Sequence, residues 1–519
     1  MLERIRGRMS LGVNALILVL VGAAAGWADV RLPALISDHM VLQQGVSAAI
    51  WGTADPGEAV TVKFREREYS ATAGSDGKWR VHLEPISAGG PFDLDVSGRN
   101  AMRIADVMVG EVWVCSGQSN MQWTVAQAMN PDQEKAAAQS PQIRMFTVKR
   151  TVADRLQEDF VGQWEICSPE TVGGFSAVGY YFGRELHRSL KVPVGLIHSS
   201  WGGTPAESWT SEGALRADRS LDPILWNWQR TLAEYPTARA RHERQLKEWE
   251  EQSARAKAEN RPAPQRPAVP RAPGDSWTPS GLYNAMIAPM TSYAIRGAIW
   301  YQGESNANPY RSIEYRRLFQ TMIEDWRRAW GEPFPFLFVQ LANYMERKAD
   351  PGDSQWAELR ESQAYALGLP NTGMAVAIDI GEANDIHPKN KQEVGRRLSL
   401  AARSVAYGED IIGSGPIYQG MKIEGNQIRI RFHPVGAGLE ARGDRIEGFA
   451  IAGRDRKFVW GEARIEGSTV VVSSPQVPNP VAVRYGWADN PACNLYNRAG
   501  LPASPFRTDD WPSSAAPSR

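Results

Sequence analysis

Apolar stretches along the chain fall into three regions with different spacing. From Val30 to about Ala105, short apolar runs such as Ala48–Trp51 and Val60–Phe64 alternate with turn-forming residues. Short apolar runs bounded by Gly, Pro and Asp turns are typical of antiparallel strands. The first region therefore predicts a small β-sandwich domain over residues 29–105.

The second region, residues 106–410, has apolar stretches separated by amphipathic ones. Its expected strands are apolar on both faces, which is typical of a parallel sheet covered by helices. Alternation of such strands with helices predicts a mainly parallel, doubly wound α/β domain. The expected strands are Val107–Cys115, Val192–His198, Ile295–Tyr301, Phe336–Leu341 and Met374–Ile380, and the expected helices are Ala177–Leu190, Ile313–Trp330 and Ala357–Leu367.

An insertion interrupts this domain at about residues 232–274. Leu232–Lys257 is rich in Arg and Glu and predicts a solvent-exposed helix. The Pro-rich stretch Asn260–Gly274 predicts an extended loop. We interpret the insertion as a surface excursion, with a lid over a catalytic site as the alternative.

The third region, residues 411–510, returns to the β pattern. Expected strands are Ile428–Phe432, Phe449–Ala452 and Val470–Ser473, with Gly and Asn turns between them. Residues 511–519 are rich in Pro, Ser and Ala and are predicted to form a disordered tail.

The first 28 residues have the pattern of a secretory signal peptide. The pattern consists of positive charge at Arg4, Arg6 and Arg8, an apolar run from Leu11 to about Ala25, and small residues at Gly26 and Ala28. An uncleaved membrane anchor is the alternative, but the run is short for a span of ~20 residues. We therefore expect cleavage before Asp29, export to the periplasm or the medium, and no membrane span in the mature protein.

Composition narrows the classes of partner. The chain of 519 residues has a formal net charge of zero, which gives no reason to expect nucleic acid as a partner. Its 19 tryptophans fit either core packing or stacking on sugar rings. The three cysteines, Cys115, Cys167 and Cys493, form no C-x-x-C pair, so no zinc site is expected. An exported protein can hold one disulfide, although Cys115 lies in an apolar run that favours a buried thiol.

Four polar clusters follow predicted strands, at the edge of the sheet where catalytic residues of open α/β sheets gather. The first is Gly117-Gln118-Ser119-Asn120-Met121, in which Gly117 permits a tight turn and Ser119 is a candidate nucleophile. If a helix begins at Asn120, its dipole favours negative charge developing beside Ser119. A helix-capping role is the structural alternative for Ser119.

The next two clusters offer groups that could stabilise an oxyanion. In His198-Ser199-Ser200-Trp201-Gly202-Gly203-Thr204, paired glycines can point backbone N–H groups into a pocket, or simply form a turn. In Trp300-Tyr301-Gln302-Gly303-Glu304-Ser305-Asn306, the Gln302 amide can donate to an oxyanion. Glu304 can orient a neighbour, bind substrate or serve a structural role. We expect His198 to be a core or supporting histidine rather than the base.

The fourth cluster runs from Asp379 to Pro388. Pro388 is suited to the first turn of a helix that continues to about Tyr407, with Gly408 just past its end. His387 then lies on a loop at the edge of the sheet, where it can take a proton from a serine on a neighbouring strand end.

Three of these segments together resemble the sialate O-acetylesterase family, part of the SGNH hydrolases. The segments are Gly117-Gln118-Ser119-Asn120-Met121, Trp300-Tyr301-Gln302-Gly303-Glu304-Ser305-Asn306 and Asp385-Ile386-His387-Pro388. The resemblance extends to Ser200-Trp201-Gly202-Gly203-Thr204-Pro205 and to the N-terminal β region, and so covers most of the mature chain. It implies an α/β fold, namely a flavodoxin-like, three-layer SGNH-hydrolase domain with flanking β-sandwich-type domains, and a serine mechanism without metal or cofactor.

The resemblance also implies a role for each site residue. Ser119 would be the nucleophile and His387 the base, and the oxyanion hole would comprise the Ser119 N–H, the Gly202 or Gly203 N–H and the Gln302 side chain. Substrate contacts would come from Gln118, Asn120, Glu304 and Trp201. SGNH enzymes commonly place an orienting Asp three residues before the His, where this chain has Asn384. Asp385, Glu304, Asp379 or a backbone carbonyl can take that role, or the site is a Ser–His dyad.

The expected activity is therefore hydrolysis of O-acetyl esters on a carbohydrate. Acetylated sialic acid, of the 9-O-acetyl type, is the substrate that gives the family its name, and acetylated xylan is the alternative. A non-catalytic sugar-binding protein is the alternative of another class. The sequence indicates no oligomeric state.

Overall fold

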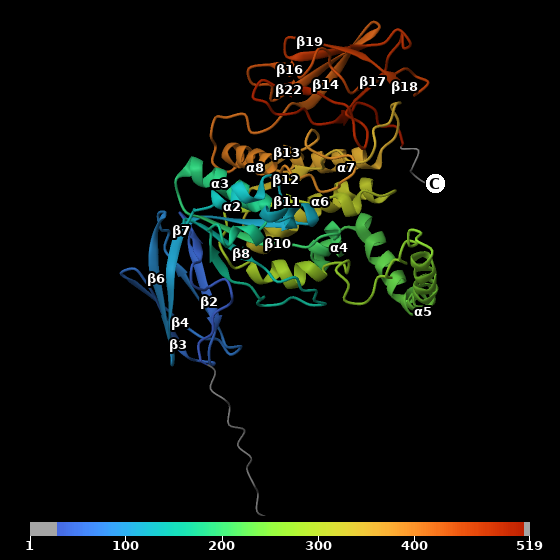
Figure 1. Ribbon diagram of the computed structural model, residues 1–519. Helices are drawn as coiled ribbons and strands as arrows, with labels where there is room; N and C mark the ends of the chain where they lie inside the picture. Colours follow the sequence, from blue (N-terminus) through green and yellow to red (C-terminus); the bar gives the residue numbers. More distant parts are fainter. Residues whose placement is uncertain (1–28, 513–519) are drawn as a thin grey trace, which may run out of the picture.

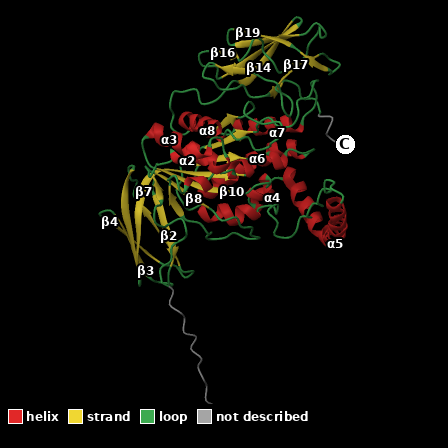
Figure 2. Cartoon of the chain, viewed as in Figure 1, coloured by secondary structure: helices red, strands yellow, loops and turns green. Residues whose placement is uncertain are grey.

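The computed structural model describes residues 29–512, so the predicted signal peptide and residues 513–519 lie outside the described part. A central α/β region separates an all-β region at the N-terminal end from another at the C-terminal end (Figure 1). Among the described residues, all helices lie in the central region (Figure 2).

A mainly parallel sheet forms the centre of the molecule. Its strand order is β13-β12-β11-β7-β10-β8-β9, and of these neighbours only β8 and β9 are antiparallel. The inner strands β10, β11 and β12 are buried at every residue, as strands covered on both faces must be. The bounds are β7 Ala101–Gly117, β8 Ile143–Thr147, β9 Trp164–Ile166, β10 Val194–Ser200, β11 Gly297–Tyr301, β12 Phe336–Gln340 and β13 Thr372–Val376.

This sheet confirms the predicted α/β class. Each of the five predicted strands is present with shifted ends, whereas the short edge strands β8 and β9 were missed. The strands β10-β7-β11-β12-β13 have the order 2-1-3-4-5 when numbered along the chain. The connections reverse direction at β7, so a crevice is expected at the carboxyl ends of β7 and its neighbours.

Helices cover both faces of the sheet. Trp113 of β7 meets Phe182 of α3 with ring centroids 5.0 Å apart, whereas Trp300 of β11 meets Trp326 of α6 at 5.8 Å. Helix α8 packs on α3, and α7 packs beside α6, which completes three layers. The bounds are α1 Ser119–Gln122, α2 Pro131–Ala136, α3 Ala177–Leu190, α4 Glu212–Ala217, α5 Asp222–Ala258, α6 Arg311–Trp330, α7 Gln355–Ala364 and α8 Lys391–Val405.

Two helix boundaries differ from the prediction. Helix α8 begins at Lys391, because the Asn390 side chain caps it by accepting a hydrogen bond from the Glu393 N–H at 3.1 Å. Pro388 therefore precedes the helix and does not occupy its first turn. Helix α5 begins at Asp222, well before the expected start at Leu232, and lies at the periphery of the molecule (Figure 1). No residue of 232–274 lines the cavity at the carboxyl ends of β7 and β10, which favours the surface excursion over the lid.

Strand β7 continues from the N-terminal β region into the central sheet. Its first half pairs with β6 and β1, and its second half pairs with β10 and β11. The predicted domain division at residues 105 and 106 stays a prediction, and it falls inside this strand. The other strands of the region are β1 Val41–Gln43, β2 Ala48–Thr53, β3 Ala59–Phe64, β4 Arg67–Thr72, β5 Lys78–Leu83 and β6 Gly89–Ser97.

The C-terminal region consists of antiparallel sheets around a separate apolar core. It is joined to the central region by the buried Arg360 of α7, which donates to the carbonyl oxygens of Ala488 at 2.7 Å and Asp489 at 3.0 Å. Trp511, assigned to the tail, packs on Phe458. The strands are β14 Ile417–Glu424, β15 Gln427–His433, β16 Leu439–Ala441, β17 Phe449–Ala452, β18 Phe458–Trp460, β19 Glu462–Glu466, β20 Thr469–Ser473, β21 Ala482–Tyr485, β22 Leu495–Asn497 and β23 Phe506–Arg507.

The structure also addresses possible disulfides and possible membrane-spanning helices. Cys115, Cys167 and Cys493 are all free thiols, and Cys115 is buried as expected. Within residues 29–512, no helix is both long enough and apolar enough to cross a bilayer.

Candidate active site

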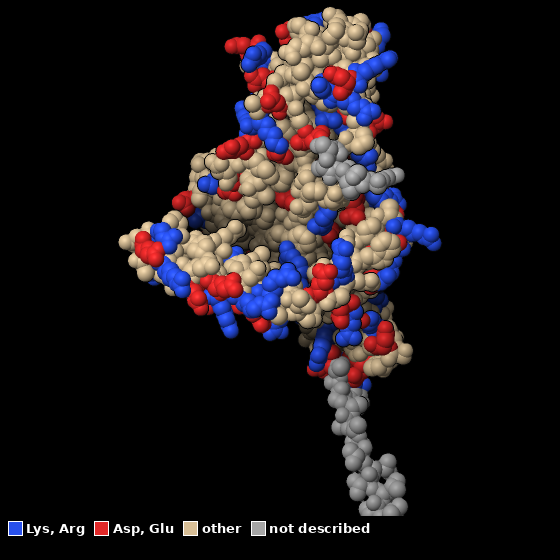
Figure 3. Space-filling view, turned by 90° about the vertical axis from the view of Figure 1, so that its right-hand side faces the viewer, with Lys and Arg blue, Asp and Glu red and all other residues tan. Residues whose placement is uncertain are grey.

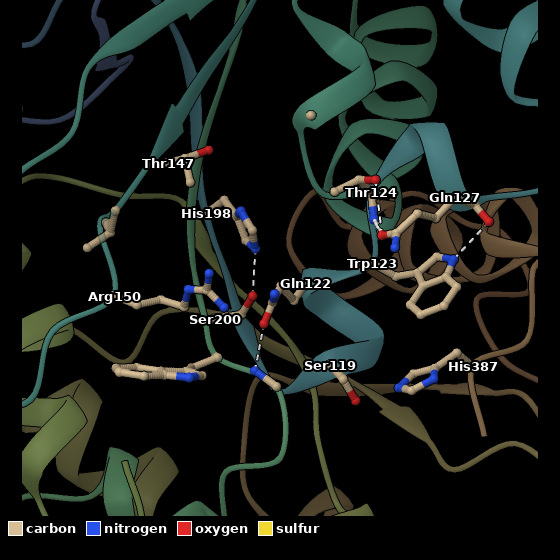
Figure 4. Close-up of a pocket in the computed structure, with 14 residues that line it drawn as sticks. Ser119, Gln122, Trp123, Thr124, Gln127, Thr147, Arg150, His198, Ser200 and His387 are labelled. Atoms are coloured by element: carbon tan, nitrogen blue, oxygen red, sulfur yellow. Dashed lines mark hydrogen bonds between the residues drawn. The ribbon is translucent and has the colours of Figure 1, made fainter. Parts of the chain in front are cut away.

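A cavity of about 510 Å³ opens at the carboxyl ends of β7 and β10. The face of the molecule in Figure 3 is hollowed below the C-terminal region, and Lys and Arg side chains gather along its lower rim. Ser119 and His387 both line the cavity, although they come from opposite ends of the α/β region (Figure 4). Other lining residues that matter below are Gln122, Trp123, Arg150, His198, Ser200, Trp201 and Gly202.

Ser119 directly follows a tight turn at the end of β7. Gly117 has a φ of 137°, and a Cβ at this position would overlap the carbonyl oxygen of Tyr301, so only glycine fits. Gln118 is the N-cap of α1 and Ser119 is its first residue, so the capping alternative for Ser119 does not apply. Because α1 has only four residues, the expected contribution of a helix dipole is small.

His387 is held by stacking and by a carboxylate. Its ring stacks on Trp123 with centroids 4.6 Å apart and an interplanar angle of 13°. Nδ1 lies 3.4 Å from Oδ1 of Asp385, and the same oxygen accepts a hydrogen bond from the His387 backbone N–H at 2.8 Å. The Ser119 hydroxyl and the imidazole point toward one another (Figure 4), and no hydrogen bond joins them within the described residues. Burial lowers the pKa of His387, the charge of Lys391 lowers it further, and Asp385 partly opposes both.

Of the proposed orienting groups, Asp385 is the carboxylate that contacts His387. Both Asp379 oxygens are bound by the Arg397 guanidinium, at 2.6 and 2.8 Å, and one also accepts from Tyr496. Glu304 is buried, and its Oε1 accepts from Asn120 at 2.6 Å. Asp379 and Glu304 therefore belong to other networks.

Gly202, rather than Gly203, lies beside Ser119. A Cβ on Gly202 would be 3.2 Å from the Ser119 Cβ, whereas one on Gly203 would meet nothing within 4 Å. The Gly202 N–H donates to Oε1 of Gln122 at 2.7 Å. The Ser119 N–H has no acceptor within the part of the chain that the structure describes.

The oxyanion role implied for Gln302 does not agree with its surroundings. Its amide nitrogen donates to the Thr204 carbonyl at 3.2 Å and to Asn306 at 2.7 Å, and its oxygen accepts from Tyr315 at 2.9 Å. The side chain is fully buried and does not line the cavity. The oxyanion role of Gln302 stays a prediction, and it would require the side chain to leave its hydrogen bonds with Thr204, Asn306 and Tyr315.

Three of the four residues expected to bind substrate lie beneath the cavity. Gln118 accepts from the Ser305 N–H at 3.2 Å, and Asn120 donates to Glu304 and to the Ile386 carbonyl. None of the three lines the cavity. Trp201 does line the cavity, with the Arg150 guanidinium 5.8 Å from its ring centroid.

Lys391 is a buried residue that the sequence analysis missed. Its ammonium donates to Oδ1 of Asn120, and burial lowers its pKa to about 7. Burial raises the pKa of Glu304, on the other side of Asn120. The sequence did indicate that Lys391 is buried, because it lies on the apolar face of its helix with Val394 and Leu398.

A second Ser–His pair lies in the same cavity. Nε2 of His198 is 2.6 Å from Oγ of Ser200, and Nδ1 of His198 is buried without a partner. Burial lowers the pKa of His198 to about 4, with Arg150 adding to the effect. This imidazole is therefore neutral at physiological pH.

No three His, Cys, Asp or Glu side chains gather closely enough to hold a metal ion anywhere in residues 29–512.

Comparison with known proteins gives consistent matches. Residues 109–233 and 269–404 match the family model described as carbohydrate esterase, sialic acid-specific acetylesterase. Sialate O-acetylesterase of Homo sapiens is 32% identical over 95% of this chain and 96% of that protein. The Rattus norvegicus sialate O-acetylesterase is 33% identical over 93% of this chain and 95% of that protein. The crystal structure of a carbohydrate acetylesterase from Xanthomonas citri is 38% identical, with a TM-score of 0.79, and covers 93% of this chain and 100% of that one.

Burial of neutral His198 predicts a stability that depends on pH. Because the folded pKa of about 4 lies below the usual value of 6.5, the unfolded chain binds the proton first as pH falls. The contribution is present above pH 6.5 and is lost towards pH 4, by about 3 kcal/mol in total. Urea unfolding across this range should show a steeper loss in the wild type than in His198→Gln. The exposed control His82→Gln should follow the wild type, and parallel curves for His198→Gln and the wild type would refute the prediction.

Proposed function

Because the chain belongs to the sialate O-acetylesterase family of carbohydrate esterases, we propose that it cleaves O-acetyl esters of sugars with Ser119 as nucleophile and His387 as base. The observation that carries this proposal is the meeting of the two side chains in one cavity, with Asp385 against the imidazole. The strand order 2-1-3-4-5, with Ser119 after the first of these strands and His387 after the last, supports an SGNH-type, flavodoxin-like domain.

The proposed reaction is acyl transfer in two steps. Nε2 of His387, the nitrogen away from Asp385, takes the Ser119 proton while Oγ attacks the acetyl carbonyl. His387 then protonates the departing sugar hydroxyl, and a water activated by His387 releases acetate from Ser119. The Ser119 and Gly202 N–H groups are placed to stabilise the oxyanion, each by roughly 3–4 kcal/mol, and Gly202 must first release Gln122.

The pair Ser200 and His198 is the competing assignment, and its electrostatics argue against it. A general base is most effective when its pKa lies near the working pH. The pKa of His198 is lowered to about 4, and no carboxylate contacts its Nδ1. His387 is only partly buried and has Asp385 beside it, so it is the better base.

Arg150 supports an acidic sugar as the substrate. Its guanidinium is exposed in the cavity and forms no ion pair or hydrogen bond with the described residues, and no Asp or Glu lines the cavity. An unpaired guanidinium suits the carboxylate of sialic acid, whereas acetylated xylan offers no such group on its xylose units. Trp201 adds a flat surface on which a sugar ring can stack. A non-catalytic sugar-binding protein would use the same surface without releasing acetate.

The N-terminal pattern further supports export to the periplasm or the medium. Cleavage is proposed before Asp29, the first of the described residues. N-terminal sequencing of the protein after expression in a bacterium should begin at Asp29. A chain that retains Met1 in the membrane fraction would contradict the proposal.

Exchange of each cavity serine separates the two Ser–His pairs. Ser119→Ala should lower turnover of an aryl acetate by at least ~10⁴-fold, because the acyl-enzyme cannot form. Ser200→Ala is the matched control and should retain most of the turnover, with a lower melting temperature because the buried His198 loses a hydrogen bond. Loss of activity in Ser200→Ala alone would assign the nucleophile to Ser200 instead.

Arg150 offers a test of the substrate class. Arg150→Gln should reduce kcat/KM for O-acetyl sialic acid by about 10–100-fold, since a charge-assisted hydrogen bond is lost. Release of acetate from a neutral aryl acetate and from acetylated xylo-oligosaccharides should change little. Equal effects on acidic and neutral substrates would refute the role of Arg150 in charge recognition.

A further inference from the structure

A titratable side chain is buried against Asn120, the residue that follows the proposed nucleophile. Lys391, on the first turn of α8, has no solvent-accessible surface, and its ammonium donates to Oδ1 of Asn120. The same ammonium lies 5.3 Å from the centroid of the Tyr301 ring. Burial of an ammonium is costly, and an apolar side chain of similar length would fill this space at lower cost.

Asn120 connects this charge to both proposed catalytic residues. It follows Ser119 in the sequence, and its amide donates to the carbonyl of Ile386, the residue before His387, at 3.0 Å. The other amide hydrogen bond goes to Oε1 of Glu304 at 2.6 Å. Asn120 therefore fixes the His387 loop against the turn that holds Ser119, and Lys391 fixes the orientation of the Asn120 amide.

Charged groups reach this cluster from three elements. Lys391 comes from α8, Asp385 and Glu382 from the loop before α8, and Glu304 from the segment after β11. The pKa of His387 itself responds to Lys391, which lowers it, and to Asp385, which raises it. The two neighbouring charges thus act on the imidazole with opposite signs.

We propose that Lys391 is a positioning residue of the esterase site: by holding the Asn120 amide it fixes the His387 loop beside Ser119, and it brings its own positive charge to that loop. This inference rests on the proposed function. An imidazole that remains unprotonated to lower pH stays available as a base over a wider range.

The pH dependence of kcat/KM tests the role of the charge. Acetate release from an aryl acetate is measured from about pH 4.5 to 8, where the acid limb reports protonation of His387 in the free enzyme. In Lys391→Met a positive neighbour is lost, so the midpoint of the acid limb should move to higher pH. In Asp385→Asn a negative neighbour is lost, and the midpoint should move down.

A double variant controls for misfolding of the single variant Lys391→Met. Lys391→Met leaves Glu304 buried without a countercharge, so the double variant Lys391→Met/Glu304→Gln removes both charges. It should melt closer to the wild type than the single variant and show the same upward shift of the acid limb. A folded variant without Lys391 whose acid limb coincides with that of the wild type would overturn the proposal.

A measurement on the wild type does not depend on either variant. NMR titration of the His387 imidazole should give a midpoint below that of an unstructured histidine peptide, and a midpoint at or above the peptide value would also overturn the proposal. Failure of the proposed function has a different signature, namely wild-type turnover in Ser119→Ala.

Discussion

Strand β7 pairs with β1 and β6 in its first half and with β10 and β11 in its second, and Ser119 follows its last residue by two positions. The position of Ser119 in the site therefore depends on how this one strand pairs with its neighbours. Gly117 brings the end of this strand so close to the Tyr301 carbonyl that no side chain fits there. Glu111, buried in the middle of β7, accepts hydrogen bonds from Arg296 at 2.8 Å and Tyr407 at 2.9 Å. A buried carboxylate needs such partners, so the strand is fixed at its centre as well as at its end.

Beneath the cavity lies a layer of polar side chains that touch each other rather than the cavity. Gln118, Asn120, Gln302 and Glu304 all belong to it, and each is bonded to a backbone or side-chain group of another segment. In a low-dielectric interior these hydrogen bonds resist rearrangement, since breaking one leaves a further unpaired buried group. These polar residues of the sequence motifs thus hold loops in place, and few other motif residues line the cavity.

These buried polar side chains explain why the sequence predicted some parts of the site and not others. Continuous apolar strands predicted the sheet, and the rule that ligands bind at the carboxyl ends of parallel strands predicted that Ser119 and His387 lie close together. The same rule could not tell whether a polar residue near a strand end faces the cavity or the core. A shift of one residue reverses that direction, and Gln302 and Asn120 turned out to face inward. Lys391 was missed because a lysine at a helix start is usually solvated, and only its neighbours on the apolar face indicated burial.

The contact between Gln122 and Gly202 shows that polar groups at the cavity surface also need hydrogen-bond partners. An oxyanion hole needs donors that are free when charge develops, yet an unpaired N–H in a partly buried site is unfavourable without a ligand. The Gln122 side chain satisfies this donor in the absence of a ligand, because its Oε1 accepts from the Gly202 N–H at 2.7 Å. A neutral amide is a weaker acceptor than an oxyanion, so the exchange favours the transition state over the empty site. In the proposed mechanism, Gln122 therefore keeps the Gly202 N–H oriented until the oxyanion replaces it as acceptor.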